Sequence, residues 1–341
     1  MKILISSHFF HPSVGGIEEV SYALAHEFVA SGHEVKVITQ TTEDSDAKFP
    51  FEVQRQPGVG GLLRLVKWCD VFFHNNISLR YAWPLLLIKR PWVIAHHTWI
   101  ARTDGRIGLR DRIKQSVLQR ASNITMSKAM AATINAPVTV IGNPYRNEFF
   151  QLQPDIARDR ELVFLGRLVS DKGVDILFNA LDVLAKRGLH PKLTVIGTGP
   201  EESALRKLSA QSGIQDQIEF VGKKSGTELV HLLNRHQIMV VPSRWQEPFG
   251  LVALEGAACG CVIIGSECGG LPDAIGLCGI TYTHHDATDL ANSIHQLLTP
   301  ETNLEKFRLA ASAHLAKHTA KAVAARYLQV IQAASNHPKP Q

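Results

Sequence analysis

Two cations and two acids in the second half of the chain have residue types and a spacing that could bind an anionic ligand carrying hydroxyl groups. Arg167 ends the apolar run LVFLG, and Lys172 follows in GRLVSDKG, just before a helix-like segment. Arg can hold a phosphate through two hydrogen bonds and Lys acts as a point charge, so the pair suits a diphosphate. The alternative is a solvated loop of ordinary surface cations, with Asp171 pairing either one.

The two acids lie in VVPSRWQEPFGLVALEGAACG, residues 240–260. Glu247 falls in the polar loop, and Glu255 falls on the apolar segment that follows, which predicts a helix over 249–259. An unpaired acid buried on such a helix is costly. Hydroxyl groups of a ribose or another sugar would supply the missing donors. The alternative is that Glu255 pairs with an Arg such as Arg244 and that Glu247 is exposed.

Glycines follow several apolar runs just before predicted helices. A glycine turn lets the backbone approach a ligand, and the free N–H groups of a helix start favour an anion. Each turn taken alone is also explained as an ordinary entry into a helix, as at Pro200, which is expected in a first helical turn. The glycines are Gly15 with Gly16, Gly197 with Gly199, and Gly269 with Gly270.

A dinucleotide dehydrogenase is disfavoured by two observations. The G-x-G-x-x-G fingerprint is missing after the first apolar run. The second run, VKVIT, is followed by Gln40 where a dinucleotide-binding fold would place an acid for the ribose.

Short apolar runs alternate with helix-length segments along the whole chain. Runs apolar at nearly every position indicate strands buried on both faces, as in parallel sheets covered by helices. The alternation predicts βαβ units. The runs are 3–6, 35–39, 71–74, 92–96, 124–127, 138–142, 162–166, 193–197, 218–222, 238–243, 261–266 and 280–283, and the clearest helices are 17–31, 174–187, 200–212 and 287–298.

The segment GNPYRNEFFQLQPD, residues 142–155, has two prolines and no periodicity, so it predicts a domain boundary. The fold class is α/β, with two Rossmann-like, doubly wound domains facing a central cleft. We expect an N-terminal domain over 1–145, which the resemblance described below implies to be acceptor-binding, and a C-terminal domain over 146–320, which it implies to be donor-binding. The Ala-rich segment 321–341 is expected to form a helix that could pack back on the first domain. Ligands of such sheets bind beyond the carboxyl ends of the strands.

Composition narrows the class of protein further. The chain has 341 residues, 45% of them hydrophobic, and a formal net charge of +5, which suits an anionic ligand or membrane surface without identifying a partner. No run approaches the roughly 20 apolar residues that span a bilayer. The start MKILISSHFF is typical of a first strand and not of a signal peptide, so we expect a cytoplasmic protein. The five cysteines form no CxxC pair and are expected to be buried thiols.

Taken together, these motifs resemble a known family. GG near residue 15, GRLVSDKG at 166–173, GTGP at 197–200, PSRWQEPFGLVALEGAACG and GGLPDAI occur in this order over nearly the whole chain. This arrangement is similar to the family-4 glycosyltransferases of the GT-B fold. The resemblance implies retaining transfer of a sugar from a nucleotide-diphosphate donor, with no cofactor and no essential metal. Two departures are IGNPYRNEFF, which lacks the family's Asn-Gly turn, and Asp273, where the family often has Glu.

The resemblance also implies roles for single residues. Arg167 and Lys172 would hold the diphosphate and stabilise charge on the leaving group. Glu255 would bind the ribose, Glu247 the donor sugar, and the loop of Gly15 and Gly16 would lie against the phosphate or that sugar. His97, which matches the family's first-domain His better than His96, would face the donor sugar. Backbone groups for the donor would come from Phe249, Gly250 and Leu251, close to the glycines Gly197 and Gly199.

The first domain is expected to choose the acceptor. Its cations Arg102, Arg106, Arg110 and Lys114 recur every four residues, so a helix there would carry a basic stripe. Such a stripe suits an anionic lipid surface or a pyrophosphate-linked acceptor. A solvated cationic face explains it equally well. The segments LLRLVKW (62–68) and YAWPLLLIKRPW (81–92) add basic and aromatic residues consistent with a membrane-facing surface, although buried packing explains them too.

The sequence therefore predicts a retaining hexosyltransferase using a UDP- or GDP-linked donor. Its acceptor would be a glycan or a lipid-linked molecule in cell-surface polysaccharide or glycolipid synthesis. We expect it in the cytoplasm, with the inner face of the membrane as a candidate site of peripheral association. The alternatives are a nucleotide-sugar epimerase of the same fold and a non-catalytic nucleotide-sugar-binding protein. A nucleic-acid partner is not expected, since no DNA- or RNA-binding motif is present.

Overall fold

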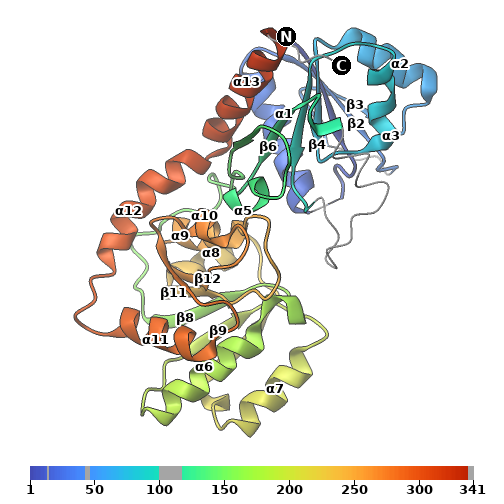
Figure 1. The fold of residues 1–341 in the computed structure, drawn as a ribbon. Helices are drawn as coiled ribbons and strands as arrows, with labels where there is room; N and C mark the ends of the chain where they lie inside the picture. Colours follow the sequence, from blue (N-terminus) through green and yellow to red (C-terminus); the bar gives the residue numbers. More distant parts are fainter. Residues whose placement is uncertain (14, 43–46, 100–116, 337–341) are drawn as a thin grey trace. The chain divides into compact units, whose positions relative to one another are not determined.

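The chain divides into two compact units, each built on its own parallel sheet (Figure 1). The structure, a computed structural model, describes residues 1–13, 15–42, 47–99 and 117–336. Unit 1 comprises Met1–Pro144 and the C-terminal segment that begins at Ala320. Unit 2 comprises Tyr145–Thr319.

In unit 1, the described residues form a seven-stranded parallel sheet in the order β3-β2-β1-β4-β5-β6-β7. The strand order reverses its direction between β1 and β4, as it does in a doubly wound sheet. β1, β4 and β5 are almost wholly buried, which explains their near-continuous apolar sequences. The strands are β1 Lys2–Ser7, β2 Glu34–Thr39, β3 Glu52–Arg55, β4 Val71–Asn75, β5 Trp92–His96, β6 Ser122–Thr125 and β7 Val138–Val140.

Helices cover both faces of this sheet. On one face α1 and α13 pack together, and the ring of Tyr327 on α13 meets Phe73 of β4 edge-on at 5.8 Å. The other face is covered by α2, α3 and the short 3-10 helix η1, whose buried side chains pack on Trp92. The helices of unit 1 are α1 Gly16–Ala30, α2 Val59–Trp68, α3 Leu79–Ala82, η1 Trp83–Leu86, α5 Lys128–Ala131 and α13 Ala320–Asn336.

Unit 2, as far as the structure describes it, has a six-stranded parallel sheet in the order β10-β9-β8-β11-β12-β13. Its core joins the strands to α6, α7 and α11. The strands are β8 Arg160–Leu165, β9 Leu193–Ile196, β10 Ile218–Gly222, β11 His236–Val241, β12 Val262–Ser266 and β13 Gly279–Tyr282. The helices are η2 Ser170–Lys172, α6 Val174–Lys186, α7 Glu202–Gln211, η3 Gln215–Gln217, α8 Gly226–Asn234, α9 Leu251–Ala258, α10 Leu271–Ile275, α11 Ala287–Leu298, α12 Glu305–Leu315 and η4 Ala316–His318.

Each predicted apolar run contains or overlaps a strand, and the predicted α/β class is confirmed. Two details differ. β3 was not predicted, because EVQR is a half-exposed edge strand without an apolar run. The predicted helix over 200–212 begins only at Glu202, so Pro200 lies in the preceding turn and not in the first helical turn.

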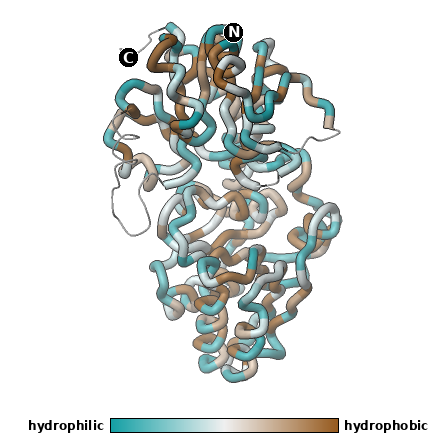
Figure 2. The backbone as a smooth tube through the Cα atoms, turned by 90° about the vertical axis from the view of Figure 1, so that its right-hand side faces the viewer, coloured by the Kyte–Doolittle hydropathy of each residue, from teal (hydrophilic) through white to brown (hydrophobic). Residues whose placement is uncertain are grey.

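Hydrophobic residues alternate with hydrophilic ones along the backbone of both units (Figure 2). Within the residues that the structure describes, none of the helices is long and apolar enough to cross a membrane.

Candidate functional site

The predicted cation Lys172 and the predicted acid Glu247 meet in unit 2. Lys172 ends η2 in the loop after β8, and Glu247 lies in the loop after β11, the neighbouring strand of the sheet. The Lys172 Nζ lies 2.6 Å from Glu247 Oε1, in an ion pair whose side chains are 28% and 15% exposed. The Ser243 hydroxyl donates a hydrogen bond to the same carboxylate oxygen over 3.0 Å. The carboxyl ends of β8 and β11 therefore carry a fixed charged pair.

The backbone ties these two loops together. The amide groups of Arg244 and Trp245 both donate to the Asp171 carbonyl oxygen, over 2.8 and 3.1 Å. Gly173 has φ +66°, and a Cβ there would lie 2.1 Å from the Pro242 carbonyl oxygen. Only glycine combines this backbone conformation with so close an approach. The glycine of GRLVSDKG thus lets the Lys172 loop reach the loop that carries Glu247.

Arg167 lies beside this pair in sequence, on an exposed extension of β8. The extension pairs with the chain after β9: Gly166 N donates to Ile196 O, and Leu168 N donates to Thr198 O, each over 3.0 Å. Among the described residues the Arg167 side chain has no ion-pair partner. It is therefore open to an anionic ligand.

Gly197 and Gly199 have a packing role that the structure shows directly. A Cβ at Gly197 would lie 1.8 Å from Gly166 O, and one at Gly199 would lie 2.2 Å from Leu168 O. Both glycines are thus required for the β8 extension to pair with the chain after β9. They thereby position Arg167. This role does not depend on whether their own backbone groups contact a ligand.

The structure disfavours the simple surface-cation interpretation of this loop. In the part of the chain that the structure describes, Asp171 forms an ion pair with neither Arg167 nor Lys172. The Arg244 guanidinium pairs with Asp175. Glu247 is not exposed, as the alternative interpretation required.

Glu255 lies on the helix α9, which follows the Glu247 loop in sequence and packs on the sheet. α9 runs over Leu251–Ala258, shorter than the predicted 249–259, and Gly250 before it has φ +104°. Glu255 is half-buried in a helix whose other residues are mostly buried. A Cβ at Gly256 would lie 2.5 Å from the Met239 sulfur of β11, so α9 packs closely on that strand. The Phe249 side chain is buried, with its ring 5.4 Å from that of His318, so only its backbone can serve a ligand.

The glycine pair after β12, Gly269 and Gly270, packs against the backbone of the loop that carries Glu247. The Gly270 amide donates to Glu247 O over 2.7 Å, and a Cβ at Gly270 would lie 2.1 Å from Pro248 O. Gly269 has φ +66°, and its Cβ would lie 2.6 Å from Glu247 O. The expectation that the backbone of this pair meets an anion is therefore wrong for the Gly270 amide, because that donor is used within the protein.

In unit 1, the predicted glycine turn begins helix α1. Gly15 precedes the helix in extended conformation and Gly16 is its first residue. The Glu18 side chain folds back over this turn, since a Cβ at Gly15 would lie 2.5 Å from Glu18 Oε2. A carboxylate in the first turn is stabilised by the helix dipole. The structure thus places an acid, itself buried, where the sequence predicted room for an anion.

His97 follows β5 and belongs to a buried polar network at the carboxyl ends of β1, β4 and β5. Its Nε2 lies 2.5 Å from Asn75 Oδ1. The Asn75 amide nitrogen donates to the Ile17 carbonyl oxygen over 3.3 Å and to the Ser21 hydroxyl, which in turn meets the Ser7 hydroxyl at 2.7 Å. Because a carbonyl oxygen can only accept, the amide orientation of Asn75 is fixed.

This orientation decides the form of the His97 ring. Burial, followed by the neighbouring His96, lowers the pKa of His97 to about 3, so the ring is neutral at pH 7. Asn75 Oδ1 accepts, so His97 Nε2 carries the proton and donates. Nδ1 therefore keeps the lone pair and can accept a hydrogen bond from a ligand hydroxyl.

The predicted basic stripe of Arg102, Arg106, Arg110 and Lys114 lies outside the described residues.

Comparison with known proteins identifies the family. Residues 146–314, almost the whole of unit 2, match the model of the glycosyl transferases group 1. The chain belongs to this family. It is therefore a glycosyltransferase, and the predicted retaining, family-4 class is confirmed.

Relatives of this glycosyltransferase extend over both units. It is 27% identical to glycogen synthase of Mycobacterium tuberculosis, over 87% of this chain and 86% of that protein. It is 26% identical to the GDP-mannose:cellobiosyl-diphosphopolyprenol alpha-mannosyltransferase of Xanthomonas campestris, over 100% of this chain and 99% of that protein. The crystal structure of HepE from Anabaena in complex with UDP matches with a TM-score of 0.77 at 19% identity, over 98% and 100% of the two chains. The GT-B fold is thereby shown.

Sequence reasoning missed two residues that support the glycosyltransferase site and gave a third another role. Ser243 holds Glu247 and Asn75 orients His97, while Gly270, which the sequence singled out for an anion, binds the Glu247 backbone. Ser243 and Asn75 share one signal, since each is a polar residue at or just after the carboxyl end of an apolar strand. That is where ligands of parallel sheets bind. Their partners are distant in sequence, so only the structure pairs them.

Proposed function

We propose that this glycosyltransferase moves a hexose from a UDP- or GDP-linked donor to a glycan or lipid-linked acceptor, with retention of configuration. One observation carries the donor assignment: the Lys172–Glu247 ion pair lies at the carboxyl ends of adjacent strands, next to the exposed Arg167. Cations suit a diphosphate and the carboxylate suits sugar hydroxyls, so this set matches both ends of a nucleotide sugar.

In the proposed mechanism, Arg167 and Lys172 hold the diphosphate. A Lys ammonium has three donors, so Lys172 can keep its bond to Glu247 and still bind a phosphate oxygen. As the bond from sugar to phosphate breaks, negative charge develops on the leaving nucleoside diphosphate, and the two cations stabilise it. Because side chains supply this charge, we propose that transfer needs no metal ion.

The remaining contacts of the donor follow from the same chemistry. We propose that Glu247 accepts a hydrogen bond from the donor sugar and that Glu255 accepts hydrogen bonds from the ribose. Backbone groups of Gly197, Gly199, Gly250 and Leu251, with that of Phe249, would complete the site. His97 Nδ1 would accept from a sugar hydroxyl, and the turn of Gly15 and Gly16, where the Glu18 carboxylate disfavours a phosphate, would lie against the donor sugar. The acceptor hydroxyl would attack the sugar from the same face as the departing nucleoside diphosphate, and its proton would pass to the departing phosphate oxygen.

The relatives support a nucleotide-sugar donor, and their names give two candidate nucleotides, GDP and UDP. The mannosyltransferase of Xanthomonas campestris is named for GDP-mannose, and HepE was crystallised with UDP. The first of these is also named for a diphosphopolyprenol acceptor, which supports a lipid-linked acceptor here. We propose that unit 1 selects this acceptor, and that the protein works in the cytoplasm at the inner face of the membrane.

A thermal-shift panel of UDP-, GDP- and ADP-sugars tests the donor site. One nucleotide class should raise the melting temperature of the protein, and Arg167→Ala should abolish that rise. The matched control is Arg187→Ala, which removes another exposed cation of unit 2. If no nucleotide sugar stabilises the protein, or if Arg167→Ala responds like Arg187→Ala, the donor assignment is wrong. Incubation with donor alone separates transfer from epimerisation, since only an epimerase would convert the donor sugar.

A further inference from the structure

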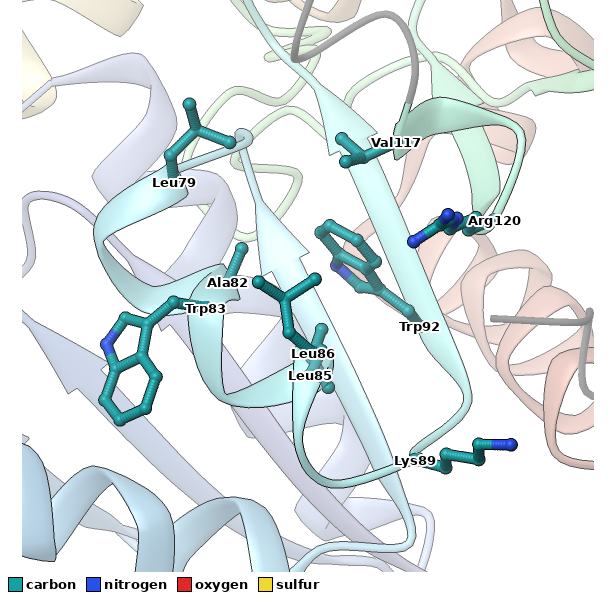
Figure 3. A pocket seen from close by; sticks show the side chains of 9 residues that line it. All are labelled: Leu79, Ala82, Trp83, Leu85, Leu86, Lys89, Trp92, Val117 and Arg120. Atoms are coloured by element: carbon teal, nitrogen blue, oxygen red, sulfur yellow. The ribbon is translucent and has the colours of Figure 1, made fainter.

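Unit 1 contains an apolar pocket of about 400 Å³ at the face covered by α3 and η1. In Figure 3, Leu86 and Trp92 point toward each other across it, and the Arg120 side chain extends toward Trp92. The Trp92 indole is fixed from behind, because its Nε1 donates to His74 Nδ1 over 2.8 Å. The pocket is lined by Leu79, Ala82, Trp83, Leu85, Leu86, Lys89, Trp92, Val117 and Arg120.

The charge around this pocket has one sign. Its polar lining residues are two exposed cations, Lys89 and Arg120. Within the described ranges, neither side chain forms an ion pair. The sequence has no Asp or Glu from residue 71 to residue 103, and none from residue 112 to residue 147. Among the described residues that line the pocket, an anion would therefore meet two cations and no carboxylate.

The rim of the pocket also exposes large apolar side chains. Leu86 and Leu87 are adjacent, and each is 73% exposed. Leu86 also lines the pocket, so it joins the apolar lining to an exposed apolar surface, and such surfaces mark interaction sites. Trp83, half-buried at the edge of the pocket, is a residue type favoured at the boundary between hydrocarbon and water.

We propose that this surface docks on a bilayer of anionic phospholipid and that the pocket takes one of the lipid's hydrocarbon chains. Leu86 and Leu87 enter the interface, while Lys89 and Arg120 lie at the level of the phosphates. Apolar burial and attraction to anionic lipid are the two contributions that hold a protein at a membrane surface. A second copy of the chain fits less well, because two such surfaces would bring four cations together. The proposal deepens the proposed function, on which its link to a lipid-linked acceptor rests.

Sedimentation with vesicles tests the docking surface. The full-length protein should bind vesicles of phosphatidylcholine mixed with phosphatidylglycerol, and should bind pure phosphatidylcholine at least tenfold more weakly. Replacing both leucines, Leu86→Asp with Leu87→Asp, should lower binding to the anionic vesicles by roughly tenfold or more. Lys89→Ala should weaken it about fivefold, which corresponds to about 1 kcal/mol for one cation near the surface. The matched control is Leu277→Asp with Leu309→Asp, which adds the same charge at two exposed leucines of unit 2.

Brominated acyl chains test the pocket itself. Bromine within the hydrocarbon region should quench tryptophan fluorescence, and Trp83→Phe should remove part of that quenching. Binding without quenching would overturn the acyl-chain assignment. The docking surface is wrong if anionic vesicles do not bind, or if the Leu86 and Leu87 variant binds like its control. It is also wrong if the protein is a dimer in solution that this variant converts to monomers.

The two proposals fail separately. The Leu86 and Leu87 variant should keep the thermal shift with nucleotide sugar, because those residues are in unit 1 and the proposed diphosphate cations are in unit 2. If no nucleotide sugar raised the melting temperature of the wild-type protein, the proposed function would be wrong, and the vesicle-binding result would still stand.

Discussion

Glu247 binds both Lys172 and Ser243 through one carboxylate oxygen, Oε1. Among the described residues, the second oxygen has no protein partner, so it can accept a hydrogen bond from a ligand. In the proposed site, the carboxylate thus holds the cation for the diphosphate with one oxygen and offers the other to the sugar. This geometry explains why an acid is needed there in addition to two cations.

Glu247→Gln should lower kcat/KM by roughly 10- to 100-fold. The amide keeps the size of the side chain but loses the charge, and hydrogen bonds to charged groups contribute about 1.5–3 kcal/mol. Ser243→Ala, which leaves the ion pair in place, should cost tenfold or less. Initial rates with the donor identified by thermal shift give both values. A Glu247→Gln enzyme as active as wild type would remove this carboxylate from the mechanism.

Asn75→Ala should lower turnover while leaving the affinity for the free nucleoside diphosphate unchanged. Asn75 fixes the proton of His97 on Nε2, and without it the neutral ring can carry the proton on either nitrogen. Ser7→Ala, at the far end of the same network, is the control and should have a smaller effect. Separate measurement of kcat and of nucleotide Kd distinguishes this positioning role from general destabilisation, which would weaken both.

At the scale of elements, the loop after β12 acts as a support for the loop after β11. Gly270→Ala should reduce stability by about 1–3 kcal/mol, because a Cβ would overlap the Pro248 carbonyl. It should also reduce turnover, since the Glu247 loop must move. Gly213→Ala is the control, with φ +67° but open space around its Cβ. Equal loss of activity in both variants, measured beside urea unfolding, would contradict the supporting role.

The packing of the helix α13 on unit 1 can be tested at Tyr327. The Tyr327 ring is fully buried in the core of unit 1, and its hydroxyl is a buried polar group that has no hydrogen-bond partner among the described residues. Tyr327→Phe should therefore be neutral or stabilise unit 1, since an unsatisfied buried hydroxyl is costly. Tyr327→Ala should cost about 3–5 kcal/mol, as for other large aromatic residues. Thermal unfolding of the two variants should shift in these different directions.

The elements also show what sequence reasoning can reach. Strands buried on both faces, such as β4 and β11, are predicted well because their apolar runs have no other explanation. The edge strand β3 is missed, since its alternating EVQR carries no run. At the site, Arg167, Lys172, Glu247 and Glu255 have recognisable types and spacing. The supports Ser243 and Asn75 do not, and the supporting role of Gly270 is not visible in its glycine pair, because these roles depend on contacts between distant loops.

At the scale of the whole molecule, both units contain buried histidines that resist protonation. Burial lowers the pKa of His74 and of His97 in unit 1 to about 3, and that of His236 in unit 2 to about 4. Below the ordinary His pKa of 6.5, the unfolded chain binds protons that the folded chain excludes. Stability must therefore fall as the pH drops from 6.5 toward these values.

Unit 1 should lose stability faster than unit 2 on acidification. Each histidine with so low a pKa contributes a slope of about 1.4 kcal/mol per pH unit, and among the described residues unit 1 has two of them and unit 2 has one. Smaller decreases in histidine pKa are balanced between the units, with His26 and His33 in unit 1 and His284 and His314 in unit 2. Calorimetry between pH 7.5 and pH 5 should show the unit 1 transition moving to lower temperature more steeply. His97→Gln should reduce that slope, and melting temperatures that do not change with pH would refute the argument.

The return of the chain to unit 1 after unit 2 has a consequence for synthesis on the ribosome. The face of the first sheet that α13 covers includes Phe73, yet α13 begins at Ala320. During translation the part of this face that α13 covers stays open while all of unit 2 is made, and unit 2 can fold as a unit first. The nascent chain thus carries a sheet face on which α1 but not α13 is packed, until α13 emerges. Chaperones that bind such surfaces should engage the N-terminal segment and release it only when the C-terminal helix arrives.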